Sequence, residues 1–196
     1  RGASAPVING LSDLYHPCQV LTDLFTIQEV KGKSFGELRT QSFKPIVAYV
    51  GDGNNIANTW MLASLVLGFS LRIATPRGFE PSATILKKIN IGRSAPIVVS
   101  HDPIEAVSGA DVINTDTWFS MGQEVTEEKR KAFSPYQVNR DLLKHAKKDA
   151  IVMHCLPAHR GEEIAADVID GPQSRVWDQA ENRLHVQKAI LEMFLK

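Results

Sequence analysis

The residues best suited to chemistry are a carboxylate, a thiol and an imidazole that flank predicted buried elements. Asp116 directly follows the apolar run 111–115, and Cys155 directly follows the run 150–154. Ligands of open α/β sheets bind beyond the carboxyl ends of the strands, so both side chains are placed to meet a small substrate. His16 opens a predicted helix, where an imidazole can receive an oxygen-rich anion with help from the helix dipole.

The thiol allows more than one interpretation. A Cys–His nucleophilic pair needs its imidazole across a cleft, whereas the neighbouring His154 points to the opposite face of the strand. His154, Cys155 and His159 do not have the spacing of a common zinc site, and a fourth ligand is not evident. We therefore expect no metal site. A buried structural cysteine is the plain alternative to a substrate-binding one.

A glycine-containing turn, 51–55, lies between a predicted strand and a predicted helix. This is the context of a dinucleotide fingerprint, but Ile56 stands where its third glycine would be. The second strand ends on no acidic residue that would bind a ribose, although Arg77 can meet a 2′-phosphate, so an NADP-binding oxidoreductase domain stays open. The favoured interpretation is that Asn55 directs its amide into the cleft and binds a small polar substrate.

Two further segments carry polar groups. The loop 116–122 contains Ser120 and a flexible Met-Gly tip, and its aromatic pair Trp118 and Phe119 favours a loop that covers something over one that is only solvated. Arg183 stands at the start of the last predicted helix. Its guanidinium can hold a planar carbonyl or phosphate group through two parallel hydrogen bonds. The alternative is a surface salt bridge, which would contribute little to stability.

The hydrophobic pattern predicts the elements that position these groups. Short apolar runs bounded by turn residues predict five buried strands, at 45–50, 69–74, 96–100, 111–115 and 150–154. Apolar residues at helical spacing and capping residues predict helices at 12–29, 54–67, 103–109, 126–133, 139–145 and 178–194, with one more beginning after Ser82. Strands that alternate with helices predict a doubly wound, mainly parallel five-stranded α/β sheet with helices on both faces, a Rossmann-like fold.

The two ends of the chain carry expectations of their own. Residues 6–9 are expected to form a short strand, and the first residues show neither Met nor a signal peptide, so we expect the chain to begin within a larger protein. The polar segment 31–44 is the expected boundary between its parts. On the last helix, the residues expected to face inward are Leu184, Ile190, Leu191 and Phe194.

Composition argues against several classes of partner. Lys plus Arg and Asp plus Glu both number 22, which removes the electrostatic case for binding nucleic acid. No apolar run reaches the length of a membrane span. The two cysteines lie far apart in the sequence, so a reduced, intracellular protein is the simplest interpretation.

Taken together, the motifs resemble those of the ornithine carbamoyltransferases. The matching segments, in the family's order and roughly its spacing, are HPCQ at 16–19, GDGNN at 51–55, DTWFSMG at 116–122, HCLP at 154–157 and AENR at 180–183. The resemblance implies transfer of a carbamoyl group from carbamoyl phosphate to the δ-amine of L-ornithine, giving L-citrulline and phosphate without a cofactor. A sister enzyme that uses a modified ornithine or putrescine, and a catalytically silent binding fragment, stay open as alternatives.

The resemblance also implies roles for individual residues. Implied to be catalytic are Asp116, Cys155 and His16, with Cys155 positioning the substrate rather than attacking it. Implied to bind ornithine are Asn55, Asp116, Ser120 and Met121. Implied to bind carbamoyl phosphate are His16, Gln19, Cys155, Leu156 through its carbonyl, and Arg183.

The same resemblance implies a division of the chain. Residues 1–30 would be the tail of a carbamoyl-phosphate domain and an interdomain helix, residues 31–178 an ornithine-binding α/β domain, and residues 179–196 a helix returning toward the first domain. The family's phosphate-gripping run Ser-x-Arg-Thr-Arg does not occur in this sequence, so these residues alone are expected to be inactive. The full-length protein is expected to be a homotrimer or higher multiple, in the cytoplasm or an organelle matrix, acting in arginine biosynthesis or the urea cycle.

Overall fold

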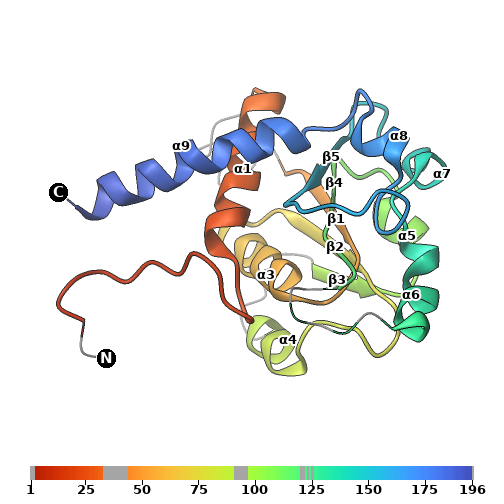
Figure 1. Ribbon diagram of the computed structural model, residues 1–196, viewed down its shortest axis with the longest axis horizontal. Coiled ribbons are helices and arrows are strands. Elements are labelled where there is room, and N and C mark those ends of the chain that lie inside the picture. Colours follow the sequence, from red (N-terminus) through yellow and green to blue (C-terminus); the bar gives the residue numbers. More distant parts are fainter. Residues whose placement is uncertain are drawn as a thin grey trace.

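The fold is organised around a five-stranded parallel sheet (Figure 1). The structure is a computed structural model, and it describes residues 3–32, 44–90, 97–119, 122, 124 and 126–195. The strand order is β3-β2-β1-β4-β5, and every neighbouring pair is parallel. The strands are β1 (Ile46–Val50), β2 (Ser70–Ala74), β3 (Ile97–Ser100), β4 (Val112–Thr115) and β5 (Ile151–His154). All five predicted strands, and the predicted fold class, are confirmed.

The sheet is covered on both faces, which is why its central strands are short apolar runs without polar alternation. Successive residues of β1 serve the two faces in turn. Val47 and Tyr49 pack with α1 (Pro17–Lys31), α3 (Asn55–Leu67) and α4 (Ala83–Asn90). Ala48 and Val50 pack with the other helical layer, which comprises α5 (Pro103–Val107), α7 (Arg140–Leu143), α8 (Ala166–Ile169) and the start of α9 (Val176–Phe194).

Two further short elements connect β4 to α7. Helix α6 (Glu127–Phe133) is capped by Thr126, whose hydroxyl accepts from the Lys129 N–H at 3.2 Å. The 3₁₀ helix η1 (Ser134–Tyr136) follows it at once. The sequence pattern predicted α6 but neither η1 nor α8, because each is a single turn and too short to show helical spacing.

The strand order places a topological switch between β1 and β4. From β1 the chain runs outward through β2 to β3 and then returns to β4 on the other side of β1. The register aligns the strand ends, because Val50 pairs with Thr115 and Thr115 with His154. The residues that follow β1, β4 and β5 therefore meet at one edge of the sheet, where ligands of such folds bind.

The start of the chain differs from the prediction. Residues 6–9 form no strand and are exposed, so the strand expected there is wrong. Helix α1 begins at Pro17 rather than near Ser12, because a turn precedes it in which the Ser12 N–H donates to the Tyr15 carbonyl at 2.9 Å. Pro17 suits the first helical position, where no N–H donor is required.

The prediction for the last helix is also wrong about its inner face. Of the four residues expected to face inward, only Ile190 is half-buried. Leu184, Leu191 and Phe194 are 62%, 49% and 49% exposed. Figure 1 shows α9 running away from the sheet, with its first half against α1. The residues it buries there include the polar pair Gln179 and Asn182, so the spacing of apolar residues misidentifies the face in contact. None of the described helices is long and apolar enough to cross a membrane.

The turn after β1 packs backbone to backbone against a neighbouring loop because Gly53 has no side chain. The Gly53 N–H donates to the Phe79 carbonyl at 2.9 Å. A Cβ atom at position 53 would collide with the backbone of residues 79–81. Glycine is therefore required here for close approach of two backbones.

We predict that Gly53→Ala destabilises the fold by about 1–3 kcal/mol or more, because the clash is with backbone that cannot rotate away. Gly10→Ala is the matched control, since no atom lies within 4 Å of a Cβ at that position. It should change the free energy of unfolding by no more than about 0.5 kcal/mol. Urea denaturation of both variants measures the difference, and equal stabilities would contradict the close approach.

Candidate functional site

Three loops place polar side chains around one carboxylate at the carboxyl edge of the sheet. Asp116, which follows β4, is 6% exposed. Its Oδ2 accepts from the Asn54 amide at 2.7 Å, and its Oδ1 accepts from the Cys155 thiol at 3.0 Å. The Thr117 N–H also donates to Oδ1 at 2.8 Å. These three donors fix the carboxylate in one orientation.

Asn54 orients the carboxylate because its own side chain is fixed by a helix start. Its Oδ1 accepts from the N–H groups of Ile56 and Ala57 at 3.0 and 3.3 Å, as the N-cap of α3, and from the Tyr49 hydroxyl at 3.2 Å. Because the oxygen is fixed in this way, the NH₂ group of the Asn54 side chain is directed toward Asp116. The sequence signalled Asn54 only as a possible helix cap, and its contact with Asp116 was missed.

Asn55, the residue predicted to bind substrate, points elsewhere. Its amide donates to the Ser12 carbonyl at 2.9 Å, so it joins the start of α3 to the segment before α1. The predicted ligands Ser120 and Met121 lie outside the described residues.

The Cys155 thiol is held in its protonated form. Burial, and then the neighbouring Asp116 carboxylate, raise the pKa of Cys155 well above its ordinary value. The thiolate is the nucleophilic form of cysteine. In this environment Cys155 is a weak hydrogen-bond donor to Asp116 rather than an attacking group.

A second group of predicted residues lies at the start of α1. The His16 ring is buried, its Nδ1 has no hydrogen-bond partner among the described residues, and its backbone N–H donates to the Thr59 hydroxyl of α3 at 2.8 Å. Burial, and then the charge of the half-buried Arg183, lower the pKa of His16. Gln19 is fully buried one turn along α1. The charge of Arg183 on α9 therefore acts on the His16 ring.

The segment after β5 is held in an uncommon backbone conformation. Leu156 has a φ of 58°, which is strained for a residue with a branched side chain. Its N–H donates to Nδ1 of His154 at 2.9 Å, and Nε2 of His154 donates to the buried Glu163 at 3.1 Å. His154 thus shapes the loop that presents Leu156.

An ion pair joins the turn after β1 to the segment after β4. Lys129 Nζ donates to Asp52 Oδ2 at 2.7 Å, and each side chain is 12% exposed. The same ammonium lies 5.3 Å from the ring centre of Phe79 and 5.4 Å from that of Phe119, within the range of cation–π attraction. Trp118 is only 3% exposed, so the loop is not merely solvated.

Two clusters have the composition of a metal site. In the first, Asp116, His154 and Cys155 offer ligand atoms within 4.8 Å of one another. A metal-binding imidazole needs a free nitrogen lone pair. Nδ1 of His154 already accepts from Leu156, and Nε2 donates to Glu163, so His154 is not arranged to bind a cation.

The second cluster comprises His159, Glu162 and Glu163. The Arg130 guanidinium pairs with Glu162 at 3.0 Å, and Nδ1 of His159 lies 3.6 Å from the second oxygen of Glu163. The Arg130 guanidinium already faces Glu162, and the His154 ring already binds Glu163, which argues against a metal ion between them.

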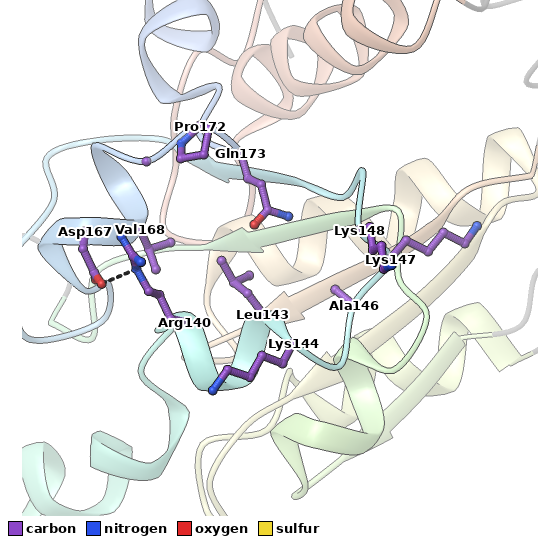
Figure 2. Close-up of a pocket in the computed structure, with 11 residues that line it drawn as sticks. Arg140, Leu143, Lys144, Ala146, Lys147, Lys148, Asp167, Val168, Pro172 and Gln173 are labelled. Atoms are coloured by element: carbon purple, nitrogen blue, oxygen red, sulfur yellow. Dashed lines mark ion pairs between the residues drawn. The ribbon is translucent and has the colours of Figure 1, made fainter.

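A cavity on the other edge of the sheet is rich in basic residues. Figure 2 shows Arg140 directed at Asp167, with which it forms an ion pair, around a space of about 440 Å³. Lys147, on the same rim, pairs with Asp111, which directly precedes β4. The cavity thus lies at the amino ends of the strands, away from Asp116. Three of its cations, Arg140, Lys144 and Lys147, are paired with carboxylates.

These features define a doubly wound α/β domain whose polar side chains gather around Asp116 at the switch point of the sheet. Residues 45–194 match the family model described as the Asp/Orn binding domain of aspartate/ornithine carbamoyltransferase, and residues 1–29 match the model of its carbamoyl-P binding domain. The chain belongs to the aspartate/ornithine carbamoyltransferase family.

Named relatives agree with this membership. The chain is 56% identical to the ornithine carbamoyltransferase of Syntrophus aciditrophicus, over 98% of this chain and 62% of the relative, and 55% identical to that of Pyrococcus abyssi, over 98% and 60%. The solved structure of the Pyrococcus furiosus enzyme superposes with a TM-score of 0.85 at 54% identity, over 96% of this chain and 59% of that one. The anabolic enzyme of Campylobacter jejuni gives a TM-score of 0.87 at 40% identity, over 98% and 62%. The chain thus spans about three fifths of the length of these relatives.

We predict that Asp116→Asn lowers the pKa of the Cys155 thiol, because it removes the carboxylate that disfavours a thiolate. The rate of alkylation by iodoacetamide as a function of pH gives this pKa, with the modified residue identified by mass spectrometry. Asp141→Asn is the control, since Asp141 is exposed and pairs with Lys144. The assignment fails if the midpoint for Cys155 does not move in the first variant, or moves equally in both.

Proposed function

We propose that this chain is the ornithine-binding part of an ornithine carbamoyltransferase, which transfers the carbamoyl group of carbamoyl phosphate to the δ-amine of L-ornithine and yields L-citrulline and phosphate. The observation that carries the proposal is the fixed Asp116 carboxylate at the switch point, with an amide on one oxygen and a protonated thiol on the other. The names printed for the relatives support it.

Asp116 suits a cationic substrate because one of its donors is easily replaced. A thiol is a weak hydrogen-bond donor, whereas an ammonium is a charged one. The α-amino group of ornithine therefore takes the place of the Cys155 hydrogen at Oδ1, and Asn54 keeps the carboxylate in position. The Ser120-Met121 segment receives the α-carboxylate together with Asn55, whose amide must give up its bond to the Ser12 carbonyl to do so. The δ-amine is then directed at the carbamoyl carbon.

The groups at the start of α1 suit the carbamoyl phosphate. Attack by the δ-amine builds negative charge on the carbamoyl oxygen, and neutral or cationic donors stabilise it. Arg183 supplies a charged donor. The lowered pKa of His16 keeps its imidazole neutral, so that the ring donates a hydrogen bond to the carbamoyl oxygen but carries no charge that would attract the phosphate. Gln19 and the Leu156 carbonyl complete the contacts with the carbamoyl group.

We assign residues 1–30 to the tail of a carbamoyl-phosphate domain and an interdomain helix, and residues 179–196 to a helix that returns toward that domain. Residues 1–30 and 179–196 line an apolar groove of about 930 Å³ between the first residues, α1 and α9, and the match of residues 1–29 to the carbamoyl-P domain model supports this division. With residues 31–178 as the ornithine-binding domain, we propose a homotrimeric enzyme or higher multiple of the cytoplasm that serves arginine biosynthesis.

The NADP alternative is disfavoured by the start of α3. A dinucleotide phosphate would need the free N–H groups at the start of that helix. The Asn54 side chain already accepts from two of them, those of Ile56 and Ala57.

We predict that these residues become active when both substrates can be positioned. Positioning two reactants supplies about 7–11 kcal/mol. A chimera that joins the carbamoyl-phosphate domain of the Syntrophus aciditrophicus relative to these 196 residues should form citrulline at a rate on the order of 10 per second. The 196-residue chain alone should form none. A folded chimera without citrulline formation would contradict the proposed function.

We predict that Asp116→Asn in this chimera lowers kcat/KM for ornithine at least about tenfold, or about 1.4 kcal/mol, because the ammonium loses its counter-charge. The KM for carbamoyl phosphate should change little. Cys155→Ser should slow turnover less, and Asp141→Asn should leave it unchanged. Steady-state kinetics across about pH 6–10 tests this, and a variant that loses carbamoyl phosphate affinity instead would refute the role of Asp116.

A further inference from the structure

A fully buried carboxyl group lies beneath the predicted carbamoyl-phosphate contacts. Asp23 is 0% exposed on the inner face of α1. Its Oδ1 accepts from the side-chain amide of Gln19 at 2.8 Å and from that of Gln179 at 2.6 Å. Two neutral amides thus share one oxygen of the carboxyl group.

This carboxyl group connects three elements of the candidate site. Gln19 lies one turn before it on α1, beside the start of the helix. Gln179 lies on α9, and its Oε1 accepts from the His154 N–H at 2.9 Å, at the end of β5 directly before Cys155. A displacement of Asp23 would therefore be transmitted to both α1 and the segment after β5.

The remaining oxygens of this pair indicate a missing proton. Asp23 Oδ2 and Gln19 Oε1 are both buried, and neither has a hydrogen-bond partner among the described residues. A buried acceptor without a donor is costly, and a buried charge more so. Gln19 Nε2 already bonds to the other oxygen of the same carboxyl group. A proton on Oδ2 would therefore make that oxygen a donor that is available to Gln19 Oε1.

The charges around Asp23 oppose one another. Arg183, on α9, favours the ionised form of Asp23, whereas the Asp116 carboxylate, after β4, disfavours it. Asp23 in turn raises the pKa of the Cys155 thiol, which stays protonated. Burial outweighs the two amide hydrogen bonds and raises the pKa of Asp23 to about 7.

We propose that Asp23 is a positioning residue of the carbamoyl-phosphate site. In its protonated form Asp23 holds the Gln19 side chain in place, and loss of the proton leaves Gln19 Oε1 without a partner. This inference rests on the proposed function for its substrate. The protonation of Asp23 does not depend on that function.

The protonation is tested on the 196-residue chain by carbon-13 nuclear magnetic resonance with labelled aspartate. The carboxyl signal that disappears in Asp23→Asn should titrate near the pKa of about 7. The side-chain amide signals of Gln19 should shift with the same midpoint. A midpoint near the ordinary value of about 3.9 would overturn the proposal, as would amide signals that do not follow the titration.

The role in binding is tested by the pH dependence of the KM for carbamoyl phosphate in the chimera. As Asp23 ionises, this KM should rise by roughly fivefold or more, the lower end of coupling between linked sites. Asp23→Asn keeps both an acceptor and a donor without a charge, so it should remain active and lose this rise. Asp23→Ala should raise the KM at every pH.

The outcomes separate the two proposals. A chimera without citrulline formation refutes the proposed function. The magnetic resonance titration then still decides whether Asp23 is protonated near neutral pH. An active chimera in which Asp23→Asn behaves like Asp23→Ala, or in which the KM of the unsubstituted protein does not rise with pH, refutes the role of Asp23.

Discussion

The cleft depends on one carboxylate whose two oxygens are held by different loops. Asp116 takes an amide from the segment after β1 and a thiol from the segment after β5. The parallel register brings these segments level, and the switch in strand order opens the space between them. Without Asp116 the same loops would converge but would have no shared partner. The chemistry proposed for the site follows from an anion that is oriented by neutral donors and therefore keeps its full charge for a cationic substrate.

A second polar arrangement lies where a soluble helix pair would ordinarily bury apolar side chains. Helices α1 and α9 meet through Asp23, Gln179 and Asn182, and the Asn182 amide donates to the Glu29 carboxylate at 2.6 Å and to the Thr26 hydroxyl at 3.1 Å. Buried hydrogen-bonded groups specify one alignment of two helices better than interchangeable apolar contacts do. That alignment sets the position of Arg183 relative to His16, so the contact between the helices belongs to the site as well as to the core.

The sequence pattern predicted the sheet well, because strands buried on both faces appear as short apolar runs between turn residues. It also selected Asp116 and Cys155 correctly as neighbours, since both follow strands of the same parallel sheet. It could not identify Asn54 or the Lys129–Asp52 pair, because their roles depend on partners that are distant in the chain. The sequence pattern also misidentified the inner face of α9. The apolar residues of that helix were assumed to face inward, whereas the partners that decide its inner face are polar.

The helix cap at Asn54 restricts which residues evolution can place there. Aspartate would cap α3 but would set a second negative charge against Asp116, and serine or threonine would cap it without amide hydrogens to donate. Glutamine would donate but is one carbon longer, which removes its oxygen from the first N–H groups of the helix. Asparagine alone satisfies both demands at once. Position 54 should therefore tolerate fewer substitutions than a helix cap that serves only its own helix, although it need not touch the substrate itself.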